Sequence, residues 1–447
     1  MKQATASVVL SVLMWDGMPA AMAQHEGHHP MPSSEVAVAG PSAFALSPDA
    51  LRTDPMDVLM RRMAIQGSGT SWQPESSPMW MWMRQADPWL WRLHGNAVFS
   101  WNGASGPRGY SEASLPNWAM LMGSRVLGPG LFDLRIMGSL DPETTPPAGT
   151  PQLFQTGETF GGVPLVDRQH PHERVMELAG MYTLPLATGT SVFLYGGPVG
   201  EPALGPNAYM HRASAADNAM VPLSHHVQDS THIVMGVLSA GVQWSRWQLE
   251  GSWFRGKEPD ENRTNIDFGA LDSYSGRLSY APTPNWAMQV STGYLTQPEA
   301  LQPGDLIRRT ASLHHNRPLP FGNWASALVW GQNRELAERP PHVENSVLVE
   351  STLDWATRNH LFGRYERVDK VGLVAGVPGE TGPVYRIHAL TLGAMRDLSV
   401  RPVVLGVGGD VTLYAKPVEL ESAYGAMPVS FRVFLRIRPP SMAHRER

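Results

Sequence analysis

Hydrophobic and polar residues alternate with a period of two along most of the chain after residue 88. In the first such segment Trp89, Trp91 and Leu93 share one face, while Arg92 and His94 share the other. Successive side chains of a β-strand point to opposite faces, so this period predicts a strand with one apolar face. The pattern recurs and predicts about sixteen strands, centred near residues 94, 121, 135, 179, 194, 238, 251, 276, 290, 311, 327, 350, 364, 391, 407 and 433.

Charged residues interrupt otherwise apolar strands, as Arg364, Glu366, Arg386 and Arg396 do. A soluble β-sandwich would have to turn these positions outward and bury the aromatic face. A barrel in lipid instead turns the aromatic face outward and keeps the charges in a wet lumen. The pattern therefore predicts an all-β fold, a single antiparallel transmembrane β-barrel of about 16 strands.

The connections between the expected strands alternate between short and long. Short ones lie near residues 128–129, 187–189, 245, 283–284, 318–321, 356–359 and 398–401, and long ones span about 102–115, 140–173, 198–231, 257–271, 297–305, 333–344, 370–384 and 415–427. Outer-membrane barrels have short periplasmic turns, long extracellular loops and an even strand count. With both termini periplasmic, every long loop reaches the same outer mouth.

The N-terminal region predicts export. Residues 1–23 look like a signal peptide, with an apolar run after Lys2 and the small residues Ala21 and Ala23 before the cleavage site. Residues 24–84 are expected to form a flexible tail that carries His and Pro, with a short helix near 50–65 capped by Ser47. The barrel then spans 85–438, and 439–447 form a C-terminal tail.

Composition limits the chemistry. The 447 residues carry a formal charge of −5 and only 17% charged residues, which gives no basic surface for nucleic acid. Cysteine is absent, so a transition-metal site must use imidazole, carboxylate or thioether ligands. The expected partners are outer-membrane lipid and small solutes or metal ions. Association into a homo-oligomer stays open.

Residues 85–438 resemble the Gram-negative outer-membrane β-barrel proteins in their succession of strands and loops. The last strand, 431–438, looks like the C-terminal assembly signal of that group, although the chain continues through 439–447. The His- and Met-bearing N-terminus is similar in composition to that of outer-membrane copper-resistance proteins. Residues 200–206 and 229–232 look like segments of an uncharacterised exported barrel group, a resemblance that implies no particular activity.

Six of the 16 histidines fall in two of the long loops, between residues 167 and 232. His170 and His172 point the same way on an extended segment, because they are two residues apart. His225 and His232 would share a helical face with a carboxylate between them. The candidate metal ligands are His170, His172, His211, His225, His226, Asp229 and His232.

These nitrogen and oxygen ligands suit Zn²⁺, Cu²⁺ or Ni²⁺, and Cu or Zn ions are the candidate cofactors. The alternative is that the histidines hydrogen-bond the backbone of a plug-like loop, with nearby carboxylates pairing with arginines. In that alternative Asp167, Glu173 and Asp229 satisfy Arg168, Arg174 and Arg212.

A second polar loop contains mixed charges between residues 255 and 272. Its carboxylates either hold a hard cation such as Ca²⁺ or form a solvated salt-bridged loop, and a third alternative pairs Asp260 or Glu261 with Arg212 of the neighbouring loop. The full set of expected lumen and loop polar residues is Asp167, Arg168, Glu173, Arg212, Glu258, Asp260, Glu261, Arg263, Asp272 and Arg277.

Three functions follow from these patterns. The first is a barrel that passes or captures small solutes, transition-metal ions among them, at a His-rich mouth. The second is a structural or adhesive barrel with a plugged lumen. The third is a hydrolase in which Ser224 or Ser230 acts with a neighbouring histidine. The chain lacks the Gly-x-Ser-x-Gly elbow of many hydrolases, so we expect no enzyme activity.

Overall fold

The computed structural model describes residues 42–301, 304–337, 342–356, 358–374 and 383–442. The expected signal peptide, the histidines of the N-terminal tail and residues 443–447 lie outside this part of the chain.

An antiparallel sheet closes on itself because β22 pairs with β2. The strands are β1 (Trp82–Ala86), β2 (Trp89–Ala104), β3 (Tyr110–Ser114), β4 (Asn117–Leu127), β5 (Gly130–Gly138), β10 (Val175–Ala187), β11 (Thr190–Val199), β12 (Val237–Trp244), β13 (Trp247–Phe254), β14 (Ser273–Tyr280), β15 (Trp286–Leu295), β16 (Leu306–Leu319), β17 (Gly322–Glu335), β18 (Val343–Trp355), β19 (Asn359–Lys370), β20 (Tyr385–Val400), β21 (Val403–Ala415) and β22 (Val429–Arg438). Each of the sixteen expected centres falls inside one of these strands.

Two of these strands, β1 and β3, had no counterpart in the sequence pattern. β3 and β4 pair with successive parts of β2 and together occupy one position in the wall. β1 pairs with the first residues of β2, along the same edge of β2 that pairs with β22 further along the strand. With β3 and β4 counted once and β1 set aside, the wall of the described chain has the sixteen strands that the alternation predicts.

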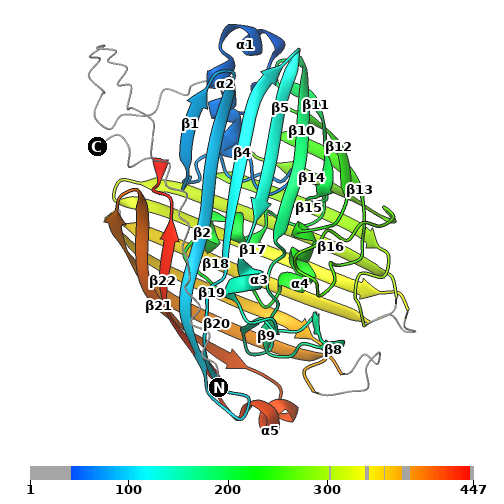
Figure 1. Ribbon diagram of the computed structural model, residues 1–447, viewed down its shortest axis with the longest axis vertical. Helices are drawn as coiled ribbons and strands as arrows, with labels where there is room; N and C mark the ends of the chain where they lie inside the picture. Colours follow the sequence, from blue (N-terminus) through cyan, green and yellow to red (C-terminus); the bar gives the residue numbers. More distant parts are fainter. Residues whose placement is uncertain (1–41, 302–303, 338–341, 357, 375–382, 443–447) are drawn as a thin grey trace, which may run out of the picture. The chain divides into compact units, whose positions relative to one another are not determined.

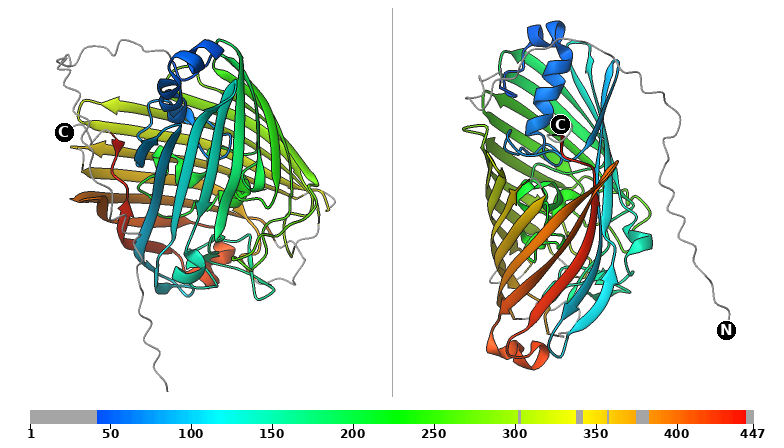
Figure 2. Two further views of the ribbon diagram at one scale, coloured as in Figure 1. Left: turned by 45° about the horizontal axis from the view of Figure 1, so that its top comes forward. Right: turned by 90° about the vertical axis from the view of Figure 1, so that its left-hand side faces the viewer.

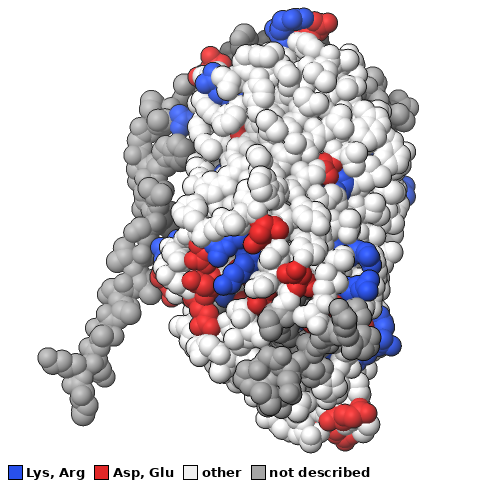
Figure 3. Space-filling model, turned by 90° about the vertical axis from the view of Figure 1, so that its right-hand side faces the viewer, with Lys and Arg blue, Asp and Glu red and all other residues white. Residues whose placement is uncertain are grey.

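Side chains alternate between the two faces of the wall as expected. On β22, Val433 is 61% exposed, whereas the neighbouring Arg432 is 4% exposed. Exposed apolar residues recur on the outer face of the other strands, including Leu194, Leu238, Trp253, Tyr274, Val290, Leu328, Val349 and Leu392. On the side of the barrel drawn in Figure 3, a largely uncharged band lies between charged residues at the top and a larger charged cluster in the lower half. This apolar belt is the lipid-facing surface of a transmembrane barrel.

Helices in the described residues are short. They are α1 (Pro48–Thr53), α2 (Pro55–Ile65), α3 (Asp141–Thr144), α4 (His225–Gln228) and α5 (Glu421–Tyr424), with single 3₁₀ turns η1 (Tyr209–His211), η2 (Ala213–Ala215), η3 (Ser230–His232) and η4 (Val418–Leu420). None of these helices is long and apolar enough to cross a membrane.

Long and short connections lie at opposite ends of the barrel. α1 marks the end with short turns, and α5 marks the end with long loops (Figure 1). The connection from β5 to β10 contains two small ladders, β6 (Thr150–Pro151) with β9 (Arg168–Gln169) and β7 (Thr159–Phe160) with β8 (Val163–Pro164). We call residues 139–174 the mouth loop.

Residues 42–81, here called the N-terminal segment, are packed rather than forming part of a flexible tail. Phe44, Leu46 and Leu51 are buried, and Arg62 donates a hydrogen bond to Gln243 on β12 at 2.6 Å. The expected helix is divided in two, because Pro55 cannot continue a helix and instead begins α2. The segment enters the end of the barrel that carries the short turns (Figure 2).

Candidate metal centre in the barrel lumen

The connection from β11 to β12, residues 200–236, folds into the lumen, and we call it the plug. Its backbone and side chains bond to inward-pointing residues of strands all around the wall. Arg277 on β14 donates to the carbonyl of Gly205, Arg308 on β16 donates to the carbonyl of His226, Ser224 donates to Glu366 on β19, and Arg436 on β22 pairs with Asp217. The plug is therefore held by the interior of the barrel and does not extend into solvent.

The mouth loop packs directly on the plug. Gln152 in the mouth loop donates to the carbonyl of Val221 in the plug at 2.8 Å. Gln155 in turn donates to Gln169 at 2.6 Å and accepts from Lys370 of β19 at 2.7 Å. Because both His-bearing loops are anchored to the same wall, their histidines meet.

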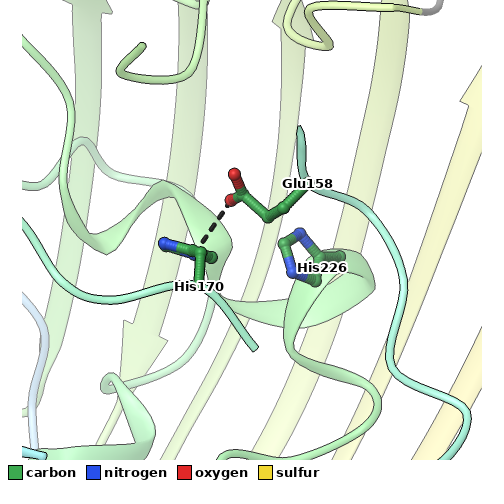
Figure 4. A group of neighbouring side chains, drawn as sticks. All are labelled: Glu158, His170 and His226. Carbon is green, nitrogen blue, oxygen red and sulfur yellow. Dashed lines mark ion pairs between the residues drawn. The ribbon is translucent and has the colours of Figure 1, made fainter. Parts of the chain in front are cut away.

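Three potential ligands meet between the two loops, and we call them the outer site. Glu158 and His170 come from the mouth loop and His226 comes from α4 of the plug (Figure 4). One ligand atom from each lies within 4.8 Å of the other two. His170 Nε2 lies 2.9 Å from Glu158 Oε1, and its Nδ1 lies 2.8 Å from the carbonyl oxygen of Pro171.

A glycine makes room for the third ligand. Gly157 has φ +118°, and a Cβ built there would lie 2.8 Å from Nδ1 of His226. That nitrogen is buried and has no hydrogen-bond partner among the described residues. An unsatisfied buried polar atom costs about 1–3 kcal/mol, so the arrangement leaves one nitrogen available to a ligand.

The electrostatic state of the outer site matches that of metal ligands. Burial opposes the charge of Glu158, but His170 and Arg263 hold the pKa of its carboxyl below its ordinary value. Burial, reinforced by the adjacent His225, lowers the pKa of His226 well below its ordinary value. At neutral pH the carboxylate is therefore ionised and the His226 ring is neutral, the forms that coordinate a cation.

A second cluster of imidazoles lies beside the outer site. The ring centres of His225 and His232 are 5.0 Å apart, and those of His172 and His232 are 6.0 Å apart. His225 and His226 are neighbours in the chain, with ring centres 5.3 Å apart. Five of the six histidines expected at the mouth are thus brought together.

The sixth, His211, lies with other residues. Its ring centre is 5.5 Å from His94 of β2 and 5.1 Å from Trp118 of β4. These side chains line a cavity of about 100 Å³ together with six methionines, Met63, Met79, Met81, Met120, Met122 and Met210. His211 also borders a smaller cavity of about 10 Å³ that reaches His232.

No protein-family model matches the chain, and no curated protein matches it. Solved structures similar to the barrel include the anion-selective porin from Comamonas acidovorans, with a TM-score of 0.47 and 10% sequence identity over 78% of this chain and 99% of that chain. The outer-membrane channel DcaP of Acinetobacter baumannii has a TM-score of 0.47 and 10% identity over 80% of this chain and 98% of its own. A loop-deletion mutant of OmpT, an outer-membrane protein of Vibrio cholerae, has a TM-score of 0.46 and 8% identity over 79% and 100%. At this level of identity the likeness concerns the fold alone.

The arginines of the plug and mouth loop are paired, but partly with other carboxylates than the sequence suggested. Arg212 pairs with Asp229 as expected, at 3.2 Å, and also with Glu350 on β18, at 2.9 Å. The expected pairing of Arg212 with Asp260 or Glu261 is wrong. The other pairs join Arg168 to Glu112, Arg174 to Glu143, Asp167 to Arg108, Glu173 to Arg263, and Arg277 to Glu250.

Carboxylates of the loop between β13 and β14 accept hydrogen bonds from backbone amides. Glu261 accepts hydrogen bonds from the amides of Gly161 and Gly162 in the mouth loop, at 2.7 and 3.1 Å. Asp272 accepts from the amide of Gly256 at 3.1 Å. The amide of Asp260 donates to Asp267, and that of Glu258 donates to the carbonyl of Pro298. The contacts of Glu261 and of the Glu258 amide fasten this loop to its neighbours, and the other two lie within the loop.

The two serines of the hydrolase hypothesis are occupied elsewhere. Ser224 Oγ donates to Glu366 Oε1 at 2.8 Å, and Ser230 Oγ accepts from Arg308 at 2.7 Å. Among the contacts of the described residues, neither hydroxyl is hydrogen-bonded to a histidine. The arrangement that would activate a serine nucleophile is not formed.

The sequence did not identify the carboxylate and hydroxyl partners of the histidines. Glu158, Asp141 and Tyr209 contact His170 or His172, yet none of them belongs to a recognisable metal-binding spacing. Glu158 stands twelve residues before His170, in a loop without periodicity. The sequence feature that could have indicated Glu158 as a ligand is its position directly after Gly157, within a loop already expected at the mouth.

Proposed function

We propose that this outer-membrane barrel captures a divalent transition-metal ion at the outer site, where the mouth loop meets the plug. The observation that carries the proposal is the convergence of Glu158, His170 and His226, with ligand atoms within 4.8 Å of one another. Two imidazoles and a carboxylate are borderline ligands that suit Zn²⁺, Cu²⁺ or Ni²⁺ better than Ca²⁺ or Mg²⁺.

The number of ligands favours capture and release over permanent binding. Structural zinc sites use four protein ligands, whereas sites that exchange a ligand leave one position open. The outer site offers three ligands from two separate loops, so movement of either loop would release the ion. Passage through the barrel then requires rearrangement of the plug.

The direct test is titration of the purified barrel in detergent with Zn²⁺ or Cu²⁺. We expect His170→Ala, His226→Ala and Glu158→Gln each to weaken binding by about 100-fold or more, because each removes a ligand. His315→Ala is the matched control, since His315 packs between Trp286 and Trp324 on the wall. Binding that is unchanged in all three site variants contradicts the proposal.

The second candidate is a structural barrel whose plug is permanently closed. The observation in its favour is the number of buried ion pairs between plug and wall, such as Arg212 with Glu350 and Arg436 with Asp217. Conductance in planar bilayers separates the two functions. A barrel that captures and passes ions should change its conductance when Zn²⁺ or Cu²⁺ is added, and a permanently closed barrel should not.

A further inference from the structure

A cavity of about 100 Å³ lies where the N-terminal segment, the plug and the barrel wall meet. It is the cavity described above beside His94 and His211, and we call it the arginine cavity. Its wall side is formed by β2, β4, β5 and β22. One water molecule needs about 10–15 Å³ of such space, so the cavity has room for roughly seven water molecules, the size of a small organic molecule.

The register of the wall places two arginines on either side of one methionine. Arg92 of β2 lies opposite Met122 of β4, and Met122 lies opposite Arg135 of β5. Two residues further along β2, on the same inward face, His94 lies opposite Met120. Residues directly opposite each other in an antiparallel sheet are about 5 Å apart. Guanidinium groups and thioethers therefore line the same side of the cavity.

Among the described residues that line the cavity, charge has a single sign. Arg212 of the plug and Arg438 of β22 join Arg92 and Arg135, and no described aspartate or glutamate borders the cavity with them. All four arginines are buried, the most exposed being Arg438 at 5%. Arginine remains protonated in proteins, and a cleft lined by one sign of charge attracts ions of the opposite sign.

Three of these guanidinium groups keep an N–H that has no hydrogen-bond partner among the described residues. Both Nη atoms of Arg92 donate to neighbouring side chains, but its Nε is buried and unpaired. The carboxylate of Asp133 is 3.6 Å from Arg92 Nη2, beyond hydrogen-bond distance. Arg212 Nη2 and Arg438 Nε are likewise buried without a partner. An unsatisfied donor on a charged group is especially costly in the interior, so an anion that accepts from these groups would be stabilising.

The rest of the lining is mostly apolar and polarizable. Besides the six methionines, Trp80 and Trp118 border the cavity. The guanidinium of Arg438 lies over the ring of Trp80, 4.2 Å from its centre. Methionine side chains adapt to irregular shapes and make favourable contacts with aromatic rings. A ligand with an anionic head and an apolar body would match both parts of the lining.

The thioethers and imidazoles alone would also suit a soft cation such as Cu⁺. The four arginines argue against that occupant, because a buried cation would add to positive charge that no described carboxylate in the lining offsets. The charge of the lining therefore favours an anion.

We propose that the arginine cavity binds a small organic carboxylate with an apolar or aromatic body. The carboxylate accepts hydrogen bonds from Arg92, Arg212 and Arg438, because planar guanidinium groups match the geometry of a carboxylate. The body packs on the methionines and on Trp118. This binding does not depend on metal capture, since the outer site uses different residues.

The test measures binding of benzoate and of hexanoate to the purified full-length barrel in detergent, by isothermal titration calorimetry. Benzamide is the neutral counterpart of benzoate and has nearly the same shape. We expect one benzoate per barrel and at least about tenfold weaker binding of benzamide, because benzamide cannot form charge-assisted hydrogen bonds as an acceptor with full negative charge.

Two variants alter different parts of the cavity. Arg92→Gln removes one guanidinium group, and Ala216→Met fills space from the plug without removing a charge. Each should weaken benzoate binding about tenfold or more. Arg125→Gln is the matched control, because Arg125 lies over the ring of Trp89 and does not line the cavity. Heat-dependent mobility in detergent gels verifies that each variant forms a barrel.

A wild-type barrel that binds neither carboxylate overturns the carboxylate site, and so does equal binding of benzoate and benzamide. Benzoate binding that both Arg92→Gln and Ala216→Met leave unchanged would place the ligand elsewhere and also overturns it. Binding of Cu⁺ but not of benzoate, lost in Met120→Ala, would assign the cavity to a soft cation instead. None of these results concerns Zn²⁺ at the outer site, so each leaves the proposed function standing.

Discussion

Arg212 couples the plug to the barrel wall through a buried ion pair. Its side chain is fully buried and bridges Asp229 in the plug and Glu350 on β18. Arg212→Met keeps the length of the side chain and removes the charge. The change leaves two buried carboxylates without their shared cation, which should weaken attachment of the plug to the wall.

The expected cost follows from the remaining partners of the two carboxylates. Removing one member of a buried ion pair typically costs about 3–5 kcal/mol, since an uncompensated charge is left behind. Here Asp229 keeps His225, and Glu350 keeps Arg364 and Ser214. The cost should therefore be near the lower limit, about 3 kcal/mol, equivalent to an increase of about 150-fold in the population with a released plug.

Single-channel recording in planar bilayers measures this population as the fraction of time that the channel is open. We expect an open fraction about 150-fold higher in Arg212→Met than in the wild type. Arg174→Met is the control, because Arg174 and its partner Glu143 are 40% and 50% exposed and such pairs contribute only about 0–1 kcal/mol. If the open fraction of Arg212→Met is no higher than that of the control, the buried bridge does not hold the plug.

Three further changes test other parts of the structure. Gly157→Ala should lower affinity for Zn²⁺ at least about tenfold without loss of the barrel, since the new Cβ would lie 2.8 Å from Nδ1 of His226; titration of the folded variant measures it. Asp229→Asn should loosen the plug, because Arg212 and His225 lose the carboxylate that they share, read as a higher open fraction in planar bilayers. Val433→Arg, on the lipid-facing side of β22, should lower the free energy of unfolding in bilayers by up to about 2–4 kcal/mol, depending on depth, and an unchanged denaturation midpoint would argue against the lipid belt.

The barrel wall was predictable from the sequence because its determinants are local. Along β22, Phe431 and Val433 face lipid while Arg432 and Arg436 face the interior, and each alternation is visible within a few residues. β3 and β1 were missed for the same reason. They are five residues each, too short to establish a period, and their pairing depends on where β2 runs.

The interior was less predictable because it depends on contacts distant in the sequence. The N-terminal segment has a short amphipathic helical pattern, but nothing local in it indicates where it packs; Arg135 of β5 donates to the carbonyls of Gly67 and Gly69 and fixes it inside the barrel. The histidines were conspicuous as a group, but which of them meet at the outer site depends on Glu158, which no spacing identifies. Polar loops inside a barrel obey hydrogen-bond satisfaction rather than periodicity.

Metal binding and plug closure should be coupled, because the outer site joins two loops. Glu158 and His170 belong to the mouth loop and His226 belongs to the plug, so a bound ion links the plug to a loop anchored on the rim. An ion at 100 times its dissociation constant stabilises the bound state by about 2.7 kcal/mol, close to the loss of about 3 kcal/mol expected for Arg212→Met. Saturating Zn²⁺ should therefore restore most of the closed state in Arg212→Met, but not in the double variant with His226→Ala. Equal open fractions with and without Zn²⁺ in Arg212→Met would show that the ion does not link the two loops.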